Sequence, residues 1–167
     1  LYVHKGSTHF KDDLYELWLN LKPKKIIGCT VAAPVVAFSL TKFFNDHDIQ
    51  WNWVRPKPRF DGRIVLNNRY ARPTQLGADR WYAAVGATDA MRKENQSLLV
   101  VHTGTATTVD SILKKDDGTY DFLGGRIAPG PSLMKDCLTR GIPSLPDSEG
   151  QYNVFPGCTS EAIITGI

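Results

Sequence analysis

Hydrophobic side chains in the first half of the chain recur at helical spacing in three stretches, and short apolar runs separate these stretches. Leu17, Trp18 and Leu21 share one face of the first stretch, and Pro34 suits the first turn of the second. The predicted elements are helices over residues 12–21, from Pro34 onward and over 78–92, strands over 25–31 and 50–54, and a loop over 55–62. Helices that alternate with short strands indicate an α/β fold.

The second half of the chain has a different pattern, in which apolar strands follow one another with short connections. The predicted elements are strands over 98–102, 106–113 and 120–123, and helices over 131–140 and 159–167. An Asp-Asp-Gly turn at 116–118 is typical of a hairpin, so these strands predict an antiparallel meander. The polar segment 93–97 divides the two patterns, and we therefore predict one subdomain over residues 1–97 and the start of another over 98–167.

Composition excludes several classes of protein. Hydrophobic residues make up 42% and charged residues 22% of the chain, which is enough for a core. The net charge of +3 is too small and too dispersed to indicate nucleic-acid binding. No apolar run approaches the ~18 residues of a membrane span. The three cysteines are widely spaced, which indicates neither a disulfide framework nor a zinc site and favours a cytoplasmic location.

The ends of the sequence suggest a longer protein. The chain begins at Leu1 without an initiator Met, and the apolar face of the last predicted helix still continues at Ile167. We therefore expect segments beyond both ends, and we expect the 167-residue chain alone to be inactive.

Two glycine-containing segments could bind phosphate. Residues 102–110 (HTGTATTVD) place Gly104 between threonines at the end of an apolar strand, where backbone N–H groups and hydroxyls can converge on an anion. Residues 124–130 (GGRIAPG) lead directly into a helix, whose N-terminus favours anions. The structural alternatives are a β-favouring threonine run with a tight turn, and a closely packed loop.

A third candidate lies between Tyr70 and Trp81. Asp79 and Arg80 follow Gly77 at the start of the helix predicted over 78–92. A carboxylate there can accept a proton from a substrate hydroxyl, and a guanidinium can hold a carboxylate. The structural alternatives are a helix cap for Asp79, a solvated side chain for Arg80 and core packing for the two aromatic residues. We assign Trp81 to the core.

In order, the chain shows YxRPxxLGADRW, GTATTVD, GGxIxPG and TxxAIxxG. This order resembles the type III pantothenate kinases of the actin-like ATPase superfamily, from about Lys25 to the end. The resemblance implies a ribonuclease H-like α/β architecture with two related subdomains, mixed sheets and flanking helices. It also implies ATP-dependent phosphorylation of pantothenate to 4'-phosphopantothenate, the first step of coenzyme A biosynthesis, by a homodimer in the cytoplasm that uses ATP with Mg²⁺.

The resemblance assigns roles by position. It implies that Asp79 is the catalytic proton acceptor and that the acceptor contacts are Tyr70, Gly77, Ala78, Asp79, Arg80 and Thr159. It implies that Gly104 and Thr105 contact ATP. From the residues alone, Thr159 could equally cap a helix.

The chain departs from the family pattern at two places. The phosphate-binding DxGN(T/S)R segment is absent. His102 stands where the family has an aspartate that binds a monovalent cation, K⁺ or NH₄⁺. An imidazole offers nitrogen to a cation that prefers oxygen, so His102 argues against cation dependence.

Three other interpretations stay open at this point. The protein could be a regulatory accessory-factor paralogue without catalytic activity. It could be a kinase of the same superfamily that acts on a different acceptor, such as a sugar. It could also be a phosphate-binding module without catalysis.

Overall fold

The computed structural model describes residues 10–31, 33–145 and 149–167, and the chain forms two compact units. Unit 1 consists of Leu1–Pro56 and Thr74–Tyr82, and unit 2 consists of Lys57–Pro73 and Ala83–Ile167. Among the described residues, no helix is both long and apolar enough to cross a membrane. The subdomain boundary predicted between residues 97 and 98 differs from these divisions and stays a prediction about the full-length protein.

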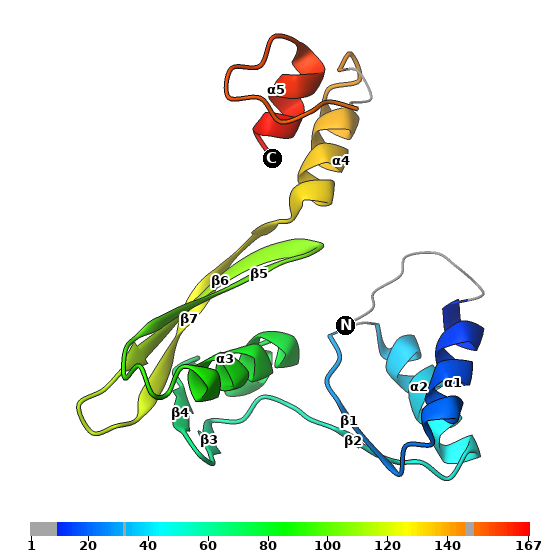
Figure 1. The fold of residues 1–167 in the computed structure, drawn as a ribbon, viewed down its shortest axis with the longest axis vertical. Helices are drawn as coiled ribbons and strands as arrows, with labels where there is room; N and C mark the ends of the chain where they lie inside the picture. Colours follow the sequence, from blue (N-terminus) through cyan, green and yellow to red (C-terminus); the bar gives the residue numbers. More distant parts are fainter. Residues whose placement is uncertain (1–9, 32, 146–148) are drawn as a thin grey trace. The chain divides into compact units, whose positions relative to one another are not determined.

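The described part of unit 1 contains helices α1 and α2, the first turn of α3 (Ala78–Ala90) and a two-stranded parallel sheet (Figure 1). The order along the chain is α1 (Phe10–Leu21), β1 (Lys25–Gly28), α2 (Pro34–Asp46) and β2 (Gln50–Trp53). Parallel strands need a long crossover, and α2 provides it between β1 and β2. Pro34 occupies the first turn of α2, as predicted, because the first turn does not use its backbone N–H.

The core of unit 1 is aromatic. Phe43 and Phe44 on α2 are buried, and the rings of Tyr15 and Phe43 stack with their centroids 3.9 Å apart. Trp53, the last residue of β2, packs against this core, and its Nε1 donates a hydrogen bond of 2.9 Å to Thr41 Oγ1 on α2. The apolar positions that predicted these helices and strands are therefore the ones that supply the core of unit 1.

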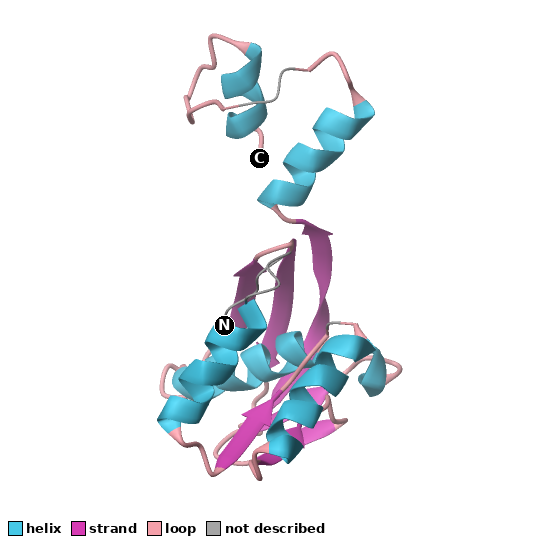
Figure 2. Cartoon of the chain, turned by 90° about the vertical axis from the view of Figure 1, so that its right-hand side faces the viewer, coloured by secondary structure: helices cyan, strands magenta, loops and turns pink. Residues whose placement is uncertain are grey.

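Unit 2 is built on a five-stranded mixed sheet (Figure 2). Its strands are β3 (Arg59–Asp61), β4 (Val65–Asn68), β5 (Leu98–Thr103), β6 (Ala106–Lys114) and β7 (Tyr120–Pro129), in the spatial order β3-β4-β7-β6-β5. The meander predicted for β5, β6 and β7 is confirmed. The pairing of β4 with β7 is parallel and is the part that sequence patterns did not indicate.

Three α-helices and a short 3-10 turn complete the described chain. The helices are α3 (Ala78–Ala90), α4 (Pro131–Gly141) and α5 (Thr159–Thr165), and the turn covers Pro73–Gln75. On α3, Trp81, Ala84 and Thr88 are each fully buried, so the prediction of a core role for Trp81 is confirmed. On α4 no residue is buried.

Two predictions about strands were wrong. The segment 55–62, predicted as loop, contains β3, which pairs with β4 in an antiparallel register. The strand predicted to end at residue 123 continues as β7 to Pro129, through Gly124 and Gly125. A register shift between Ser111 and Ile112 on the neighbouring β6 absorbs the irregularity, and Gly124 adopts a φ of +128° that other residues rarely adopt.

Candidate functional site

Four separate places in the two units carry the candidate residues. The first is the N-terminus of α3 in unit 1. The other three are in unit 2: the turn between β5 and β6, the segment after β4, and the start of α5.

Gly77 and the first turn of α3 hold the candidate acceptor block. The helix starts where Trp81 N donates to Gly77 O at 3.0 Å. Ala78 and Arg80 are buried, with 7% and 8% of their surface exposed, whereas Asp79 is exposed. Asp79 is therefore accessible to solvent, whereas only a small part of Arg80 is accessible.

The Asp79 carboxylate folds back over Gly77. Its Oδ1 accepts a hydrogen bond of 2.8 Å from the backbone N–H of Arg80, within the first turn of the helix. A Cβ on Gly77 would lie 2.5 Å from the same oxygen, so any other residue at position 77 would force the Asp79 carboxylate to move. Asp79 is the second residue of α3, so the interpretation of Asp79 as the N-cap is wrong, although its carboxylate still accepts a backbone N–H of the first turn. Gly77 provides the space for this side chain.

The segment that follows β1 lies close to Gly77 and Asp79, which sequence patterns did not indicate. Val31 Cγ1 is 3.6 Å from the position of a Cβ on Gly77. Burial raises the pKa of the Cys29 thiol, and the negative charge of Asp79 raises it further. Burial and, secondly, Cys29 raise the pKa of Tyr82. Cys29 therefore stays a neutral thiol at neutral pH.

The turn between β5 and β6 brings the two glycine-rich candidates together. Gly104 and Thr105 are exposed, and Gly104 N donates to Ala106 O at 3.0 Å to close the turn. Gly130, at the end of the second candidate, donates its N–H to Thr105 O at 2.9 Å. A Cβ on Gly130 would overlap the carbonyl oxygen of Gly104, so only glycine allows this approach.

Gly130 also begins α4, whose first helical residue is Pro131. Gly130 is the N-cap and provides no side-chain hydrogen bond. Figure 2 shows β7 running directly into this helix. The exposed turn and the helix N-terminus therefore share one corner of unit 2, where backbone N–H groups can meet an anion.

His102 lies on β5 beside the turn and pairs with Thr108 on β6. Its Nε2 is 3.7 Å from the position of a Cβ on Gly104. Thr108 is buried, and its Oγ1 has no hydrogen-bond partner among the described residues. Among all residues that the structure describes, no group of three or more His, Cys, Asp or Glu side chains could hold a metal ion. One imidazole and one hydroxyl do not fit an alkali cation, which prefers several oxygen ligands.

Tyr70 lies against β7. Its ring centroid is 6.0 Å from that of the buried Phe122, and its Cε1 is 3.6 Å from the position of a Cβ on Gly124. Thr159 is the first residue of α5 and is exposed, and the N-cap is Cys158, so the interpretation of Thr159 as an N-cap is wrong. Helix α5 contacts the preceding loop, because Thr165 Oγ1 accepts a hydrogen bond from Asn153 N and donates one to Asn153 O, each at 3.1 Å.

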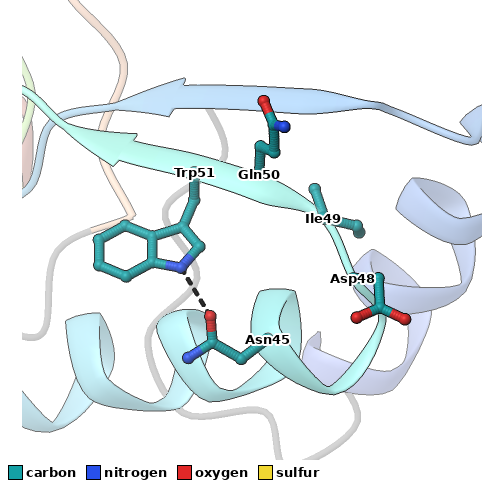
Figure 3. Close-up of a pocket in the computed structure, with 5 residues that line it drawn as sticks. All are labelled: Asn45, Asp48, Ile49, Gln50 and Trp51. Carbon is teal, nitrogen blue, oxygen red and sulfur yellow. Dashed lines mark hydrogen bonds between the residues drawn. The ribbon is translucent and has the colours of Figure 1, made fainter.

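Two surface pockets lie away from the candidate residues. Figure 3 shows one of them, in unit 1 where α2 leads into β2, with a hydrogen bond of 2.8 Å from Trp51 Nε1 to Asn45 Oδ1. It is lined by Asn45, Asp48, Ile49, Gln50 and Trp51. A second pocket is lined by residues of β5, β6 and β7 on the sheet of unit 2. Neither pocket contains a residue predicted to bind a substrate.

The family model and the individual relatives that match this chain all point to the same family. The family model of the type III pantothenate kinases matches residues 4–167. The chain is similar to a type III pantothenate kinase of Dechloromonas aromatica, with 41% identity over 68% of this chain and 44% of the relative. The enzymes named so in Acidovorax ebreus and Bordetella bronchiseptica are 36% and 35% identical over 89% of this chain. The chain spans about half the length of these curated relatives.

A solved structure supports the fold. It is described as a conserved putative Baf family transcriptional activator from Campylobacter jejuni, with a TM-score of 0.54 and 25% sequence identity. The similarity covers 91% of this chain and 62% of that chain.

Proposed function

The chain belongs to the type III pantothenate kinase family, and we propose that its full-length protein transfers the γ-phosphoryl group of ATP to the primary hydroxyl of pantothenate. The product is 4'-phosphopantothenate, and the reaction is the first step of coenzyme A biosynthesis. The observation that carries this proposal is the family match over residues 4–167, which includes the Gly77–Arg80 block at the start of α3.

Asp79 is the proposed proton acceptor. Its exposed carboxylate is held at the helix start by the Arg80 N–H, so it has a defined direction before substrate binds. In the proposed step, Asp79 takes the proton of the hydroxyl, the hydroxyl oxygen bonds to the γ-phosphorus, and the bond from that phosphorus to the leaving ADP oxygen breaks. Phosphoryl transfer depends mainly on positioning and charge stabilisation, so a weak base suffices.

The other acceptor contacts are proposed from the family pattern. We assign them to Tyr70, Gly77, Ala78, Arg80 and Thr159. Ala78 is buried, so its contribution is backbone and shape. Arg80 would meet the acceptor with the small exposed part of its side chain.

Gly104 and Thr105 are the proposed ATP contacts. Their exposed turn and the N-terminus of α4 offer backbone N–H groups to phosphate oxygens, with Gly130 joining the two. Magnesium enters as the ATP complex and neutralises phosphate charge. His102 offers a nitrogen where K⁺ prefers oxygen ligands, so we propose that the reaction does not depend on K⁺.

Several wider features belong to the same proposal. The mixed sheet and flanking helices suit a ribonuclease H-like architecture with related subdomains over residues 1–97 and from 98 onward. We further propose that the full-length protein is a homodimer and acts in the cytoplasm.

A coupled assay of ADP release by the full-length protein, with mass spectrometry of the product, tests the proposal. Pantothenate-dependent turnover is expected, and Asp79→Asn should lower kcat by about 10²–10⁴-fold. Asp89→Asn is the matched control, because Asp89 lies on the same helix and pairs with Arg63. A folded wild-type protein that forms no phosphopantothenate would contradict the proposed function.

The Campylobacter jejuni similarity favours a second candidate, a regulatory accessory factor, because that protein is described as a putative transcriptional activator. This candidate predicts that the wild-type protein lacks turnover and that Asp79→Asn leaves its regulatory effect unchanged. The same assay separates the two functions.

A further inference from the structure

A set of side chains behind Tyr70 connects its backbone to two strands. We call this set the Tyr70 bracket, and it consists of Asn68, Arg69 and Asp121. It lies entirely in unit 2, where β4 ends beside β7. Neither Asn68 nor Asp121 belongs to the motifs that carry the family resemblance.

Asn68 fixes the backbone of Tyr70 from one side. Its Oδ1 accepts the Tyr70 N–H at 3.1 Å, and its Nδ2 donates to Lys57 O at 3.3 Å. The Asn68 N–H donates to Pro58 O at 2.9 Å. Asn68 is only 8% exposed and its amide is hydrogen-bonded at both ends, so it ties the chain that leaves β4 to Lys57.

Arg69 and Asp121 fix the same segment from the other side. Arg69 N donates to Phe122 O at 3.0 Å, which extends the β4–β7 ladder by one residue. The Arg69 Nη2 lies 2.9 Å from Asp121 Oδ1 and 2.8 Å from Oδ2, and Asn67 Nδ2 donates to the same Oδ1 at 2.9 Å. The Asp121 side chain is 10% exposed, so this ion pair is screened less than a surface pair.

The ring of Tyr70 completes the arrangement. It packs against Phe122, which follows Asp121, and lies over Gly124, where φ is +128° and no side chain intervenes. Tyr70 is partly exposed, whereas Phe122 is fully buried. The Tyr70 backbone is therefore held by Asn68 of β4, and its ring packs against Phe122 and Gly124 of β7.

We infer that Asn68 and Asp121 are positioning residues, which set the direction of the Tyr70 phenol toward the acceptor. This inference rests on the proposed function. A rigid phenol contacts a bound acceptor without losing further rotational freedom, so loosening the bracket should weaken acceptor binding and leave ATP binding and the chemical step largely unchanged.

The test measures steady-state kinetics of the full-length protein with Asn68→Ala and Asp121→Ala. We expect KM for pantothenate to rise about tenfold in each, while KM for ATP and kcat change less than about threefold. Asn68→Asp keeps an oxygen that accepts the Tyr70 N–H and should recover most of the affinity. If Asp121→Ala does not fold, Asp121→Asn replaces it as the variant that removes the charge of the ion pair. Circular dichroism checks folding of each variant.

Two controls separate positioning from general stability. Asp89→Ala breaks the Arg63–Asp89 ion pair, also in unit 2, and should leave KM for pantothenate unchanged. In a Tyr70→Phe background, which lacks the phenol hydroxyl, Asn68→Ala should add little to KM, because coupled residues are not additive.

The outcomes are distinct. The inference would be overturned if the KM increases from Tyr70→Phe and Asn68→Ala multiplied fully in the double variant, or if KM rose equally for ATP and pantothenate. Either result, with normal turnover of the wild-type protein, would leave the proposed function standing. Absence of pantothenate turnover in the wild-type protein would overturn both.

Discussion

Replacing Gly130 by alanine tests the closest backbone approach in unit 2. A Cβ at this position would overlap the carbonyl oxygen of Gly104 and lie 2.8 Å from that of Thr105. Both neighbours are backbone atoms, so neither can rotate away as a flexible side chain would. The turn between β5 and β6 and the start of α4 must therefore move apart.

The magnitude follows from two losses. Separation breaks the hydrogen bond of 2.9 Å from Gly130 N to Thr105 O, which contributes about 0.5–1.5 kcal/mol. Overpacking of a tight contact costs about 1–3 kcal/mol. Gly130→Ala should thus destabilise the protein by about 2–4 kcal/mol, and KM for ATP should rise about tenfold because Gly104 and Thr105 are displaced.

Gly86→Ala is the matched control. Gly86 lies within α3, and a Cβ there would meet nothing within 4 Å. Alanine is more stable than glycine inside a helix, so this variant should gain about 0.5–1 kcal/mol in free energy of unfolding. Both positions belong to unit 2.

Urea denaturation followed by far-ultraviolet circular dichroism measures both variants. All four tryptophans lie in unit 1, so tryptophan fluorescence would report on unit 1 and not on the substituted unit 2. A Gly130→Ala protein as stable as the wild type, with unchanged KM for ATP, would refute the assigned contact between Gly130 and the turn.

Four further predictions concern the remaining candidate residues. Gly77→Ala should displace the Asp79 carboxylate and lower kcat at least about tenfold, with little change in the denaturation midpoint; unchanged kcat would contradict the packing. Replacing K⁺ by choline should leave turnover within about twofold, since His102 supplies no oxygen ligand, and a strict K⁺ requirement would show that other groups hold the cation. Burial alone would raise the pKa of Asp121, but hydrogen bonds from its neighbours and the adjacent arginine charge outweigh it and lower the pKa. Its stabilising effect is therefore present above the unfolded pKa of about 3.9 and lost as pH falls through the folded pKa, so Asp121→Asn should flatten the acid branch of a stability–pH curve. Iodoacetamide should modify Cys29 more slowly than the two exposed cysteines, as peptide mass spectrometry can show, and Asp79→Asn should speed that modification.

Local pattern was sufficient for much of the fold. The apolar spacing of α2 and α3 and the Asp-Gly turn between β6 and β7 are properties of short segments, and the structure has each element where the pattern predicts it. The predictions were wrong at β3 and along the second half of β7, because short polar strands and glycines resemble loops until a neighbouring strand pairs with them.

The sequence by itself determined the family and the candidate residues. The LGADRW and GTATTVD motifs are contiguous, so their identity and order are readable without coordinates, and the family match over residues 4–167 agrees with them. The roles of Asp79, Tyr70, Thr105 and Thr159 stay predictions until kinetics test them.

Only the tertiary structure decided what surrounds those residues. Asp79 is near enough to Cys29 for its charge to raise the pKa of the thiol, Gly130 lies against the Gly104 turn, and Asp121 pairs with Arg69 behind Tyr70. Each of these pairs joins residues far apart in the chain, and such approaches leave no periodic signal. They arise when strands and helices bring backbone and side chains to within a few ångströms, and sequence spacing does not encode that approach.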